Sequence, residues 1–379
     1  MIGIIGLGAI GRIIASDLHK FYNGKVVYIV RDKSSVNNLA KKFNAEVRFG
    51  DVNDPDSLVN AFKNLKVVIH AVHHEYNIAV MKACLKADCN YIDLGGLYHF
   101  TKKQLKLFNR FKKKNLLAII GMGASPGITN VMASYGSRFF KEINNIQFLI
   151  GSEDFSTYKK ESPLTNLYSI QTIIEEFSWK PAVFVDGKTI FVEPISGREE
   201  YKFPSPVGSK KPQFTIHSEI ATIPYNLKSK NVSFKIAFDD SFVDKILTLK
   251  RIGFTVDKDI KIKDNKVNIM DTLVNILKKL PRPIPKKLNQ YEIIRVIISG
   301  FDYYGYDKQV ILDARIESIN ETVNKDTGVP PSIVSQMIVN NLINKSGVFP
   351  PELIINDKLF FDELFKRNIF IFCNDRRIN

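Results

Sequence analysis

The chain has 379 residues, which allows two or three domains of about 100–200 residues each. Apolar residues make up 45% and charged residues 25%, a globular balance that excludes a disordered, collagenous or coiled-coil chain. Lysine and arginine total 54 against 39 acidic residues, and the resulting charge of +15 first suggests a nucleic-acid partner. The basic residues are scattered in short groups such as Lys102-Lys103 and Lys112–Lys114, outside any recognisable nucleic-acid-binding module. We therefore expect no nucleic-acid partner.

Cysteine content and apolar runs bear on the compartment. Cys84, Cys89 and Cys373 are too few and too poorly spaced for a disulfide framework or a four-ligand zinc site, and they fit reduced thiols in a cytosol. Met1 leads directly into an apolar strand without the regions of a signal peptide, and no apolar run approaches the roughly 18 residues of a membrane span. These features predict a cytoplasmic protein without a membrane partner.

A glycine-rich loop follows the first predicted strand, Ile2–Ile5. Gly6, Gly8 and Gly11 have the spacing G-x-G-x-x-G and lead into a helical run from Arg12 to Lys20. In a dinucleotide site the three glycines permit a tight turn, close approach to the pyrophosphate and close helix–strand packing, and the phosphates lie at the helix N-terminus. The loop therefore predicts NAD or NADP binding. The predicted contacts from this loop are Gly6, Gly8, Ala9, Ile10 and Gly11.

The end of the second predicted strand, Lys25–Val30, bears on the choice of cofactor. In NAD enzymes an acidic residue about 20 residues after the last glycine usually binds the ribose 2′-hydroxyl. Here Val30 occupies that place and is followed by Arg31 and Asp32. Arg31 can cover the adenine or pair with a 2′-phosphate, which favours NADP, or it can be a solvated surface charge. The choice between NAD and NADP stays open.

Strands and helices alternate through residues 1–130. Such alternation predicts a doubly wound parallel sheet, whose ligands bind outside the carboxyl ends of the strands. The predicted helices are Ser35–Phe43, Asp56–Phe62 and Glu75–Ala87, and the later strands are Ala45–Phe49, Lys66–His70, Asn90–Asp93 and Leu116–Ile120. Residues at the strand ends complete the predicted cofactor site: Asp51, Val52, His70, Ala71 and Val72.

Three histidines, His70, His73 and His74, cluster after the fourth predicted strand. A metal site would require further ligands at recognisable spacing, and the sequence offers no tetrahedral set around them. We therefore predict no metal site.

The segment from Gly121 to Asn130 joins the predicted sheet to a helix at Ile128–Phe140. Pro126 and Gly127 fix the start of that helix, whose free N–H groups attract a carboxylate or phosphate. Together with the glycine loop and Tyr91-Ile-Asp-Leu-Gly, this segment resembles the saccharopine dehydrogenase family, which includes saccharopine reductases, lysine 6-dehydrogenases and carboxynorspermidine dehydrogenases. The run from Asp326 to Ile338 is similar to the end of the shorter members, where a helix returns to the nucleotide-binding domain.

Residues 131–320 change in character. The predicted strands lie at Ile146–Ile150, Ala182–Val185, Thr189–Val192, Val232–Phe238, Glu292–Ser299 and Lys308–Glu317, and the helices lie near Leu167–Phe177, Ser241–Leu249 and Val267–Leu280. Asp186-Gly187 favours a hairpin turn, whereas the prolines of Lys278–Lys287 predict an exposed irregular loop. We predict an α+β substrate domain on a mostly antiparallel sheet, which the resemblance implies also forms a homodimer. The predicted domains are 1–130, 131–320 and 321–379.

Candidate residues for chemistry on a C–N bond lie near the predicted crevice. Such chemistry requires an acceptor for the amine proton and donors for a substrate carboxylate. Asp93, Tyr98, Glu153 and His217 are the catalytic candidates. For each a plainer role is open, because Asp93 can cap a turn, Tyr98 can pack, and exposed charges usually face solvent. The predicted substrate contacts are Gly95, Gly96, Ser125, Pro126, Gly127, Asn130 and Arg198.

The resemblance implies an NAD(P)-dependent oxidoreductase acting on the C–N bond of lysine, saccharopine or a related polyamine adduct. Ser125 stands where similar saccharopine reductases place an acidic substrate contact, and this difference favours a smaller amine such as lysine. The alternative is a sensor or structural relative that binds NAD(P) without turnover, because a fold does not guarantee an activity.

Overall fold

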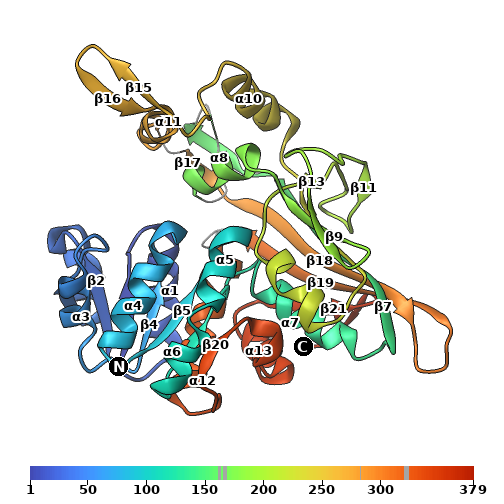
Figure 1. Ribbon diagram of the computed structural model, residues 1–379, viewed down its shortest axis with the longest axis horizontal. Helices are drawn as coiled ribbons and strands as arrows, with labels where there is room; N and C mark the ends of the chain where they lie inside the picture. The colour runs from blue at the N-terminus through green and yellow to red at the C-terminus, as the bar shows by residue number, and fades with distance from the viewer. Residues whose placement is uncertain (161–163, 165–168, 282, 320–323) are drawn as a thin grey trace.

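The computed structural model describes residues 1–160, 164, 169–281, 283–319 and 324–379 (Figure 1). Its described residues form a seven-stranded sheet, a nine-stranded sheet and three small two-stranded sheets. Except for β20, which is red-orange, the strands of the seven-stranded sheet lie in the blue and cyan part of Figure 1, and the long strands of the nine-stranded sheet cross the green and orange part. This mixed α/β arrangement confirms the predicted fold class.

The seven-stranded sheet is parallel throughout, as predicted for a doubly wound domain. Its order is β20-β6-β5-β4-β1-β2-β3. The central strands are buried along their whole length, as expected for a parallel sheet that is covered on both faces. The strands are β1 Ile2–Ile5, β2 Val26–Val30, β3 Glu46–Phe49, β4 Val67–His70, β5 Asn90–Asp93, β6 Leu117–Ile119 and β20 Gly347–Phe349.

The helices of this domain agree with the prediction except between β5 and β6. There the sequence predicted only a loop at 94–98, whereas Leu97–Leu105 and Phe108–Lys113 form helices α5 and α6. Tyr98 therefore lies on a helix instead of in a loop. The other helical elements are α1 Ala9–Phe21, η1 Lys33–Val36, α2 Asn37–Phe43, α3 Pro55–Phe62, η2 His74–Tyr76, α4 Asn77–Lys86 and α7 Ile128–Ser137.

Three long antiparallel strands form the centre of the nine-stranded sheet. They are β7 Glu142–Asp154, β18 Asn289–Phe301 and β19 Asp307–Ile319. The shorter strands are β9 Ala182–Val185, β10 Lys188–Phe191, β13 Gln213–Phe214, β14 Asn231–Ile236, β21 Ile369–Cys373 and β22 Arg376–Arg377. Among the described strands of this sheet, only β14 and β7 pair in parallel. The predicted hairpin turn is present, with positive φ at both Asp186 and Gly187.

Smaller elements surround this sheet. The helices are α8 Ile170–Ser178, η3 Glu219–Ala221, α9 Ile223–Asn226, α10 Asp240–Arg251 and α11 Ile269–Leu277. The small sheets pair β11 Tyr201–Lys202 with β12 Ser209–Lys210, β15 Asp259–Ile262 with β16 Asn265–Asn268, and β8 Thr157–Lys160 with β17 Ile284–Lys287. Residues 167–168 at the start of the predicted α8 helix lie outside the described residues.

The strand β17 corrects one prediction. Lys278–Lys287 was expected to be irregular because of its prolines, yet Ile284–Lys287 pairs with β8. The pairing shifts register on either side of Pro285, and all four residues are exposed. Proline has no backbone N–H to donate to a neighbouring strand. It is tolerated here because an edge strand does not need every backbone N–H for pairing.

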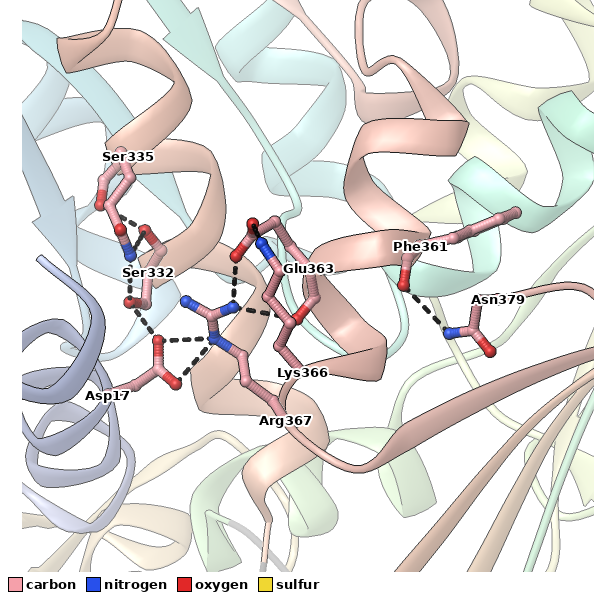
Figure 2. Close-up of polar contacts among 9 residues, drawn as sticks. Asp17, Ser332, Ser335, Phe361, Glu363, Lys366, Arg367 and Asn379 are labelled. Carbon is pink, nitrogen blue, oxygen red and sulfur yellow. Dashed lines mark hydrogen bonds and ion pairs between the residues drawn. The ribbon is translucent and has the colours of Figure 1, made fainter.

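The C-terminal segment is shared between the two large sheets. Helix α12 (Lys325–Val339) packs on α1, where Ser332 Oγ donates a 2.6 Å hydrogen bond to the buried Asp17 carboxylate, and Arg367 Nε contacts the same group at 2.9 Å (Figure 2). Then come η4 (Pro351–Leu353) and α13 (Asp357–Phe365), but β21 leaves to join the nine-stranded sheet. The prediction that 321–379 as a whole packs on the nucleotide-binding domain is therefore wrong for its last strands.

None of the helices in the described part of the chain is long and apolar enough to cross a membrane.

Candidate active site

A cavity of about 400 Å³ lies at the carboxyl ends of β1 and β2. The three glycines of the loop have different roles at this cavity. A Cβ on Gly6, which has a φ of +90°, would lie 2.6 Å from Val72 Cγ2, and a Cβ on Gly11 would lie 1.9 Å from the Gly6 carbonyl oxygen. Gly8 has nothing within 4 Å of its Cβ position. Gly6 and Gly11 therefore let the loop close on the helix, while Gly8 leaves open space where a pyrophosphate would approach.

Only some of the predicted cofactor residues line this cavity. Those that line it are Gly6, Gly8, Arg31, Asp32, Val52 and Val72. The lining does not include Ala9, Ile10, Gly11, Asp51, His70 and Ala71. The prediction missed Ser35, Asn53 and Tyr76, which face the same cavity, because it considered only the first residues after each strand.

The acidic residues near the cavity have local partners. Asp32 accepts hydrogen bonds from the Ser34 hydroxyl and backbone N–H, and these bonds lower the pKa of its carboxyl. Asp51 accepts a 2.9 Å bond from the Asn53 N–H. Both carboxylates therefore hold their own loops, and Asp32 does so at the wall of the cavity.

His70 and Asp93 lie side by side beneath the crevice, at the ends of β4 and β5. Burial lowers the pKa of His70 to about 3, so its imidazole stays neutral and lies 3.1 Å from the Tyr91 hydroxyl. Asp93 is 1% exposed and accepts bonds from the Tyr91 hydroxyl and from the N–H groups of Gly95 and Gly121. The geometry fits the turn-capping role of Asp93, and its catalytic role stays a prediction.

A buried hydrogen-bond network joins the two domains next to the loops that follow β5 and β6. Glu219 accepts hydrogen bonds from Ser125 Oγ at 2.5 Å and Thr129 Oγ1 at 2.8 Å, and its second oxygen pairs with His217 Nδ1. His217 stacks on Phe234 with ring centroids 3.7 Å apart. Ser218 accepts a 3.3 Å bond from the Gly96 N–H. The structure thus brings the predicted residues Gly96, Ser125 and His217 to one place.

The charges of this network are set by its own members. Burial alone would lower the pKa of His217, but the nearby carboxylates of Glu219 and Glu176 raise it. Burial would raise the pKa of Glu219, whereas His217 and the hydroxyls of Ser125 and Thr129 lower it. His217 and Glu219 therefore form a buried histidine–carboxylate pair in which each partner favours the charged form of the other.

The other predicted substrate contacts shape the loop between β6 and α7. Asn130 accepts a 2.9 Å bond from the Gly127 N–H and donates a 2.8 Å bond to Glu352. Pro126 lies against Gly95, since a Cβ on that glycine would be 3.0 Å from Pro126 Cδ. Gly95, Pro126, Gly127 and Asn130 therefore lie together, and the Asn130 side chain holds the backbone of this loop at Gly127.

Three predicted residues have partners outside this network. Glu153 forms an ion pair with Lys210, and Arg198 pairs with Asp240. Tyr98 packs edge-on against Phe191, with ring centroids 5.7 Å apart. The structure does not bring these side chains to His217, and their predicted catalytic or substrate roles stay predictions.

A pocket of about 40 Å³ in the second domain is strongly acidic. Its lining includes the carboxylates Glu153, Asp154, Glu292 and Asp326. Burial raises the pKa of Glu292 well above its ordinary value, and the charge of Asp326 raises it further. Thr327, which follows Asp326, lies 3.7 Å from the Cβ position of Gly123 in the loop between β6 and α7. The sequence did not indicate this grouping, since its members come from β7, β18 and the start of α12.

A second contact between the domains involves residues that the site prediction omitted. Glu175 of α8 lies 3.1 Å from His74 Nε2 and 3.5 Å from His73 Nε2. Its neighbour Glu176 is also buried and acts on His217. Two adjacent acids inside the apolar run of Ile170–Ser178 were the available signal, because buried carboxylates require partners.

The parallel sheet, its glycine loop and the adjoining cavity define a dinucleotide-binding protein. Residues 2–119 match the family described as saccharopine dehydrogenase NADP binding domain, and residues 123–369 match the saccharopine dehydrogenase C-terminal domain. The chain belongs to the saccharopine dehydrogenase family, and its cofactor is NAD(P).

Relatives and solved structures agree with this assignment. The chain is 21% identical over 373 residues to carboxyaminopropylagmatine dehydrogenase of Synechocystis, covering 92% of this chain and 91% of the relative. It is 24% identical over 358 residues to carboxynorspermidine synthase of Vibrio alginolyticus, covering 88% and 83%.

Two solved structures share the fold. Saccharopine dehydrogenase (L-Glu forming) from Saccharomyces cerevisiae has a TM-score of 0.76 at 14% identity, covering 100% of this chain and 99% of that one. Homospermidine synthase from Legionella pneumophila, solved with NAD, has a TM-score of 0.71 at 12% identity, covering 99% and 91%.

Proposed function

We propose that this protein is an NAD(P)-dependent oxidoreductase that acts on a C–N bond in a carboxylated polyamine. The relatives in sequence that cover most of the chain are named for carboxylated polyamine compounds, carboxyaminopropylagmatine and carboxynorspermidine. Lysine and saccharopine were the first substrates suggested by the family resemblance. The names of the relatives favour the third suggestion, a polyamine adduct.

The acidic pocket carries this proposal. Of the four carboxylates around about 40 Å³, Glu153 pairs with Lys210, whereas Glu292 and Asp326 repel each other unless a proton or a cation lies between them. A polyamine brings ammonium groups at several positions along its chain, so one of them can neutralise Glu292 and Asp326 while the reacting nitrogen lies in the crevice. The pocket is acidic although the protein as a whole carries a charge of +15, which makes the local attraction for a cation specific.

The His217–Glu219 pair suits proton transfer at the reacting nitrogen. The bound nicotinamide supplies or accepts the hydride. His217 can give a proton to the amine or take one from it, because Glu219 stabilises its charged form. Ser125 and Thr129 hold Glu219 by hydrogen bonds from the same loop and helix that border the crevice, so the position of the pair is tied to the nucleotide-binding domain.

A substrate panel tests the proposal. Reduction of NAD and NADP is followed at 340 nm with carboxynorspermidine, carboxyaminopropylagmatine, lysine and saccharopine. We expect turnover with a carboxylated polyamine, and we expect Glu292→Gln to raise KM about tenfold by removing one charge-assisted contact of about 1.4 kcal/mol. Glu200→Gln, a change of an exposed acid in the same domain, is the matched control and leaves KM unchanged.

The alternative function, cofactor binding without turnover, predicts a different result. A protein that binds NADPH but changes no absorbance with any of the four amines contradicts the enzyme proposal and favours a sensor. Turnover of lysine alone, with KM unaffected by Glu292→Gln, contradicts the polyamine assignment but keeps the enzyme. The homodimer implied by the family resemblance stays a proposal, which sedimentation of the purified protein tests.

A further inference from the structure

His73, His74 and Glu175 form a buried cluster between the two domains. The histidines follow β4, directly after the cavity residue Val72, and the glutamate comes from α8. One ligand atom from each residue lies within 4.8 Å of the others, and this is the only such group of three or more histidine, cysteine and acidic residues found in the described ranges. Their side chains are 13%, 8% and 4% exposed.

The spacing of the ligand atoms fits a metal ion. Zinc binds imidazole nitrogen and carboxylate oxygen at about 2.0–2.1 Å in tetrahedral geometry, which separates neighbouring ligand atoms by about 3.3 Å. Glu175 Oε2 lies 3.1 Å from His74 Nε2, and Glu175 Oε1 lies 3.5 Å from His73 Nε2. Each imidazole therefore faces a different oxygen of the same carboxylate, and both separations are close to that of neighbouring ligand atoms.

Hydrogen bonding within the cluster is incomplete. Both ring nitrogens of His73, His74 Nε2 and one oxygen of Glu175 are buried and have no aligned hydrogen-bond partner among the described residues. Buried polar atoms without partners are costly and uncommon in folded proteins. A cation placed among the three side chains would accept a lone pair from each of them. The histidine–glutamate pairs lie close together but are not aligned for hydrogen bonds that would satisfy the same atoms.

The surroundings also suit a divalent ion. The Glu175 carboxylate is buried, at 4% exposure, and lies beside both imidazoles. Glu75 lies 3.4 Å from His73 Nδ1, on the side of the ring away from Glu175. A carboxylate beside the second nitrogen of a histidine ligand orients the ring and makes it a better ligand.

We propose that His73, His74 and Glu175 bind a divalent transition-metal ion of the zinc type. Three protein ligands leave a fourth position for water or another ligand. Because the histidines belong to the nucleotide-binding domain and Glu175 to the second domain, the ion joins the two domains beside the dinucleotide cavity. This site is independent of the proposed reaction, which needs no metal.

Cobalt titration of the purified, chelator-treated protein tests the site. Tetrahedral Co²⁺ with histidine ligands absorbs in the visible range. We expect this absorption to saturate at one Co²⁺ per chain and to disappear when Zn²⁺ displaces the cobalt. His74→Ala and Glu175→Gln should each weaken binding at least 100-fold, and Glu75→Gln about 10-fold, because removing an outer partner costs 10–100-fold. His19→Ala, at an exposed histidine on α1, should leave the titration unchanged.

Two readouts separate this proposal from others. NADPH binding and circular dichroism show whether each variant is folded. If His74→Ala or Glu175→Gln does not fold, His73→Asn is titrated with cobalt in its place. Absence of visible absorption, or equal cobalt affinity in the wild type and in His74→Ala, overturns the metal site and leaves a direct histidine–glutamate contact. Turnover of the chelator-treated enzyme bears only on the proposed function, so failure of one proposal is distinguishable from failure of the other.

Discussion

The two large sheets differ in how they use polar residues. In the parallel sheet the buried polar groups His70 and Asp93 lie at strand ends, where His70 contacts the Tyr91 hydroxyl of β5 and Asp93 holds the loop at Gly95. In the nine-stranded sheet a charged pair lies within the strands: Arg295 on β18 donates from Nε and a terminal nitrogen to Asp313 on β19, at 2.6 and 2.7 Å. The first sheet therefore places its buried polar groups at the carboxyl ends of its strands, whereas the second sheet places a charged pair between two adjacent strands.

The largest expected effect tests the interior ion pair. Asp313→Leu leaves Arg295 buried without its carboxylate and should lower the free energy of unfolding by about 3–5 kcal/mol, measured by urea denaturation. The double variant Arg295→Met/Asp313→Leu should recover most of this loss, because a matched apolar pair costs little. A double variant as unstable as the single one would show that the pair is indispensable to the sheet.

Glycine substitutions test the loop of the first sheet. Gly11→Ala places a Cβ 1.9 Å from a backbone oxygen and should destabilise the protein by about 1–3 kcal/mol. Gly8→Val should leave the melting temperature nearly unchanged, because its Cβ position is open, but should weaken NADPH binding at least tenfold, about 1.4 kcal/mol. Equal losses of stability in the two variants would refute this division of roles.

The buried imidazole of His70 predicts a pH dependence. Its pKa is about 3 in the folded protein and 6.5 in the unfolded chain, so between these values the unfolded chain binds more protons. Stability from the neutral ring is complete above pH 6.5 and declines as the pH falls toward 3. His70→Asn should reduce the slope of unfolding free energy in this window by up to about 1.4 kcal/mol per pH unit. An unchanged slope would show that His70 titrates normally.

The smallest expected effect concerns Arg31 at the cavity wall. If its guanidinium pairs with a 2′-phosphate, Arg31→Ala should weaken NADPH binding about fivefold, near 1 kcal/mol, as for an exposed ion pair, and leave NADH unaffected. Fluorescence titration with both cofactors measures the ratio. Equal affinities before and after the change would assign Arg31 to the solvated surface and remove the preference for NADP.

The quality of sequence prediction differed between the two regions for a physical reason. Strands β1, β4 and β5 were predicted within one residue at either end, because short apolar runs next to glycine turns carry a local signal. Helices α5 and α6 were missed, since the segment from Thr101 to Lys114 is rich in lysine and follows a double glycine that indicated a loop. Strand β20 was missed because its partner β6 is more than 200 residues away.

The candidate site was predictable in the same uneven way. Gly6, Gly8 and Val72 were found from position alone. His217 was a candidate, but Glu219, which gives it its charge, was not identified as its partner. Glu292 and Asp326 meet only because β18 and the start of α12 lie next to each other, a relation with no local signal.

The amino-acid sequence by itself determined the first six strands of the parallel sheet, the glycine loop and the class of cofactor, because successive elements there follow one another within about 30 positions. Only the tertiary structure decided which polar groups meet: Ser125 with Glu219, His73 and His74 with Glu175, and Arg295 with Asp313. Burial then set their charges. Charge and hydrogen bonding depend on distance and solvent access in three dimensions, which spacing along the chain does not specify.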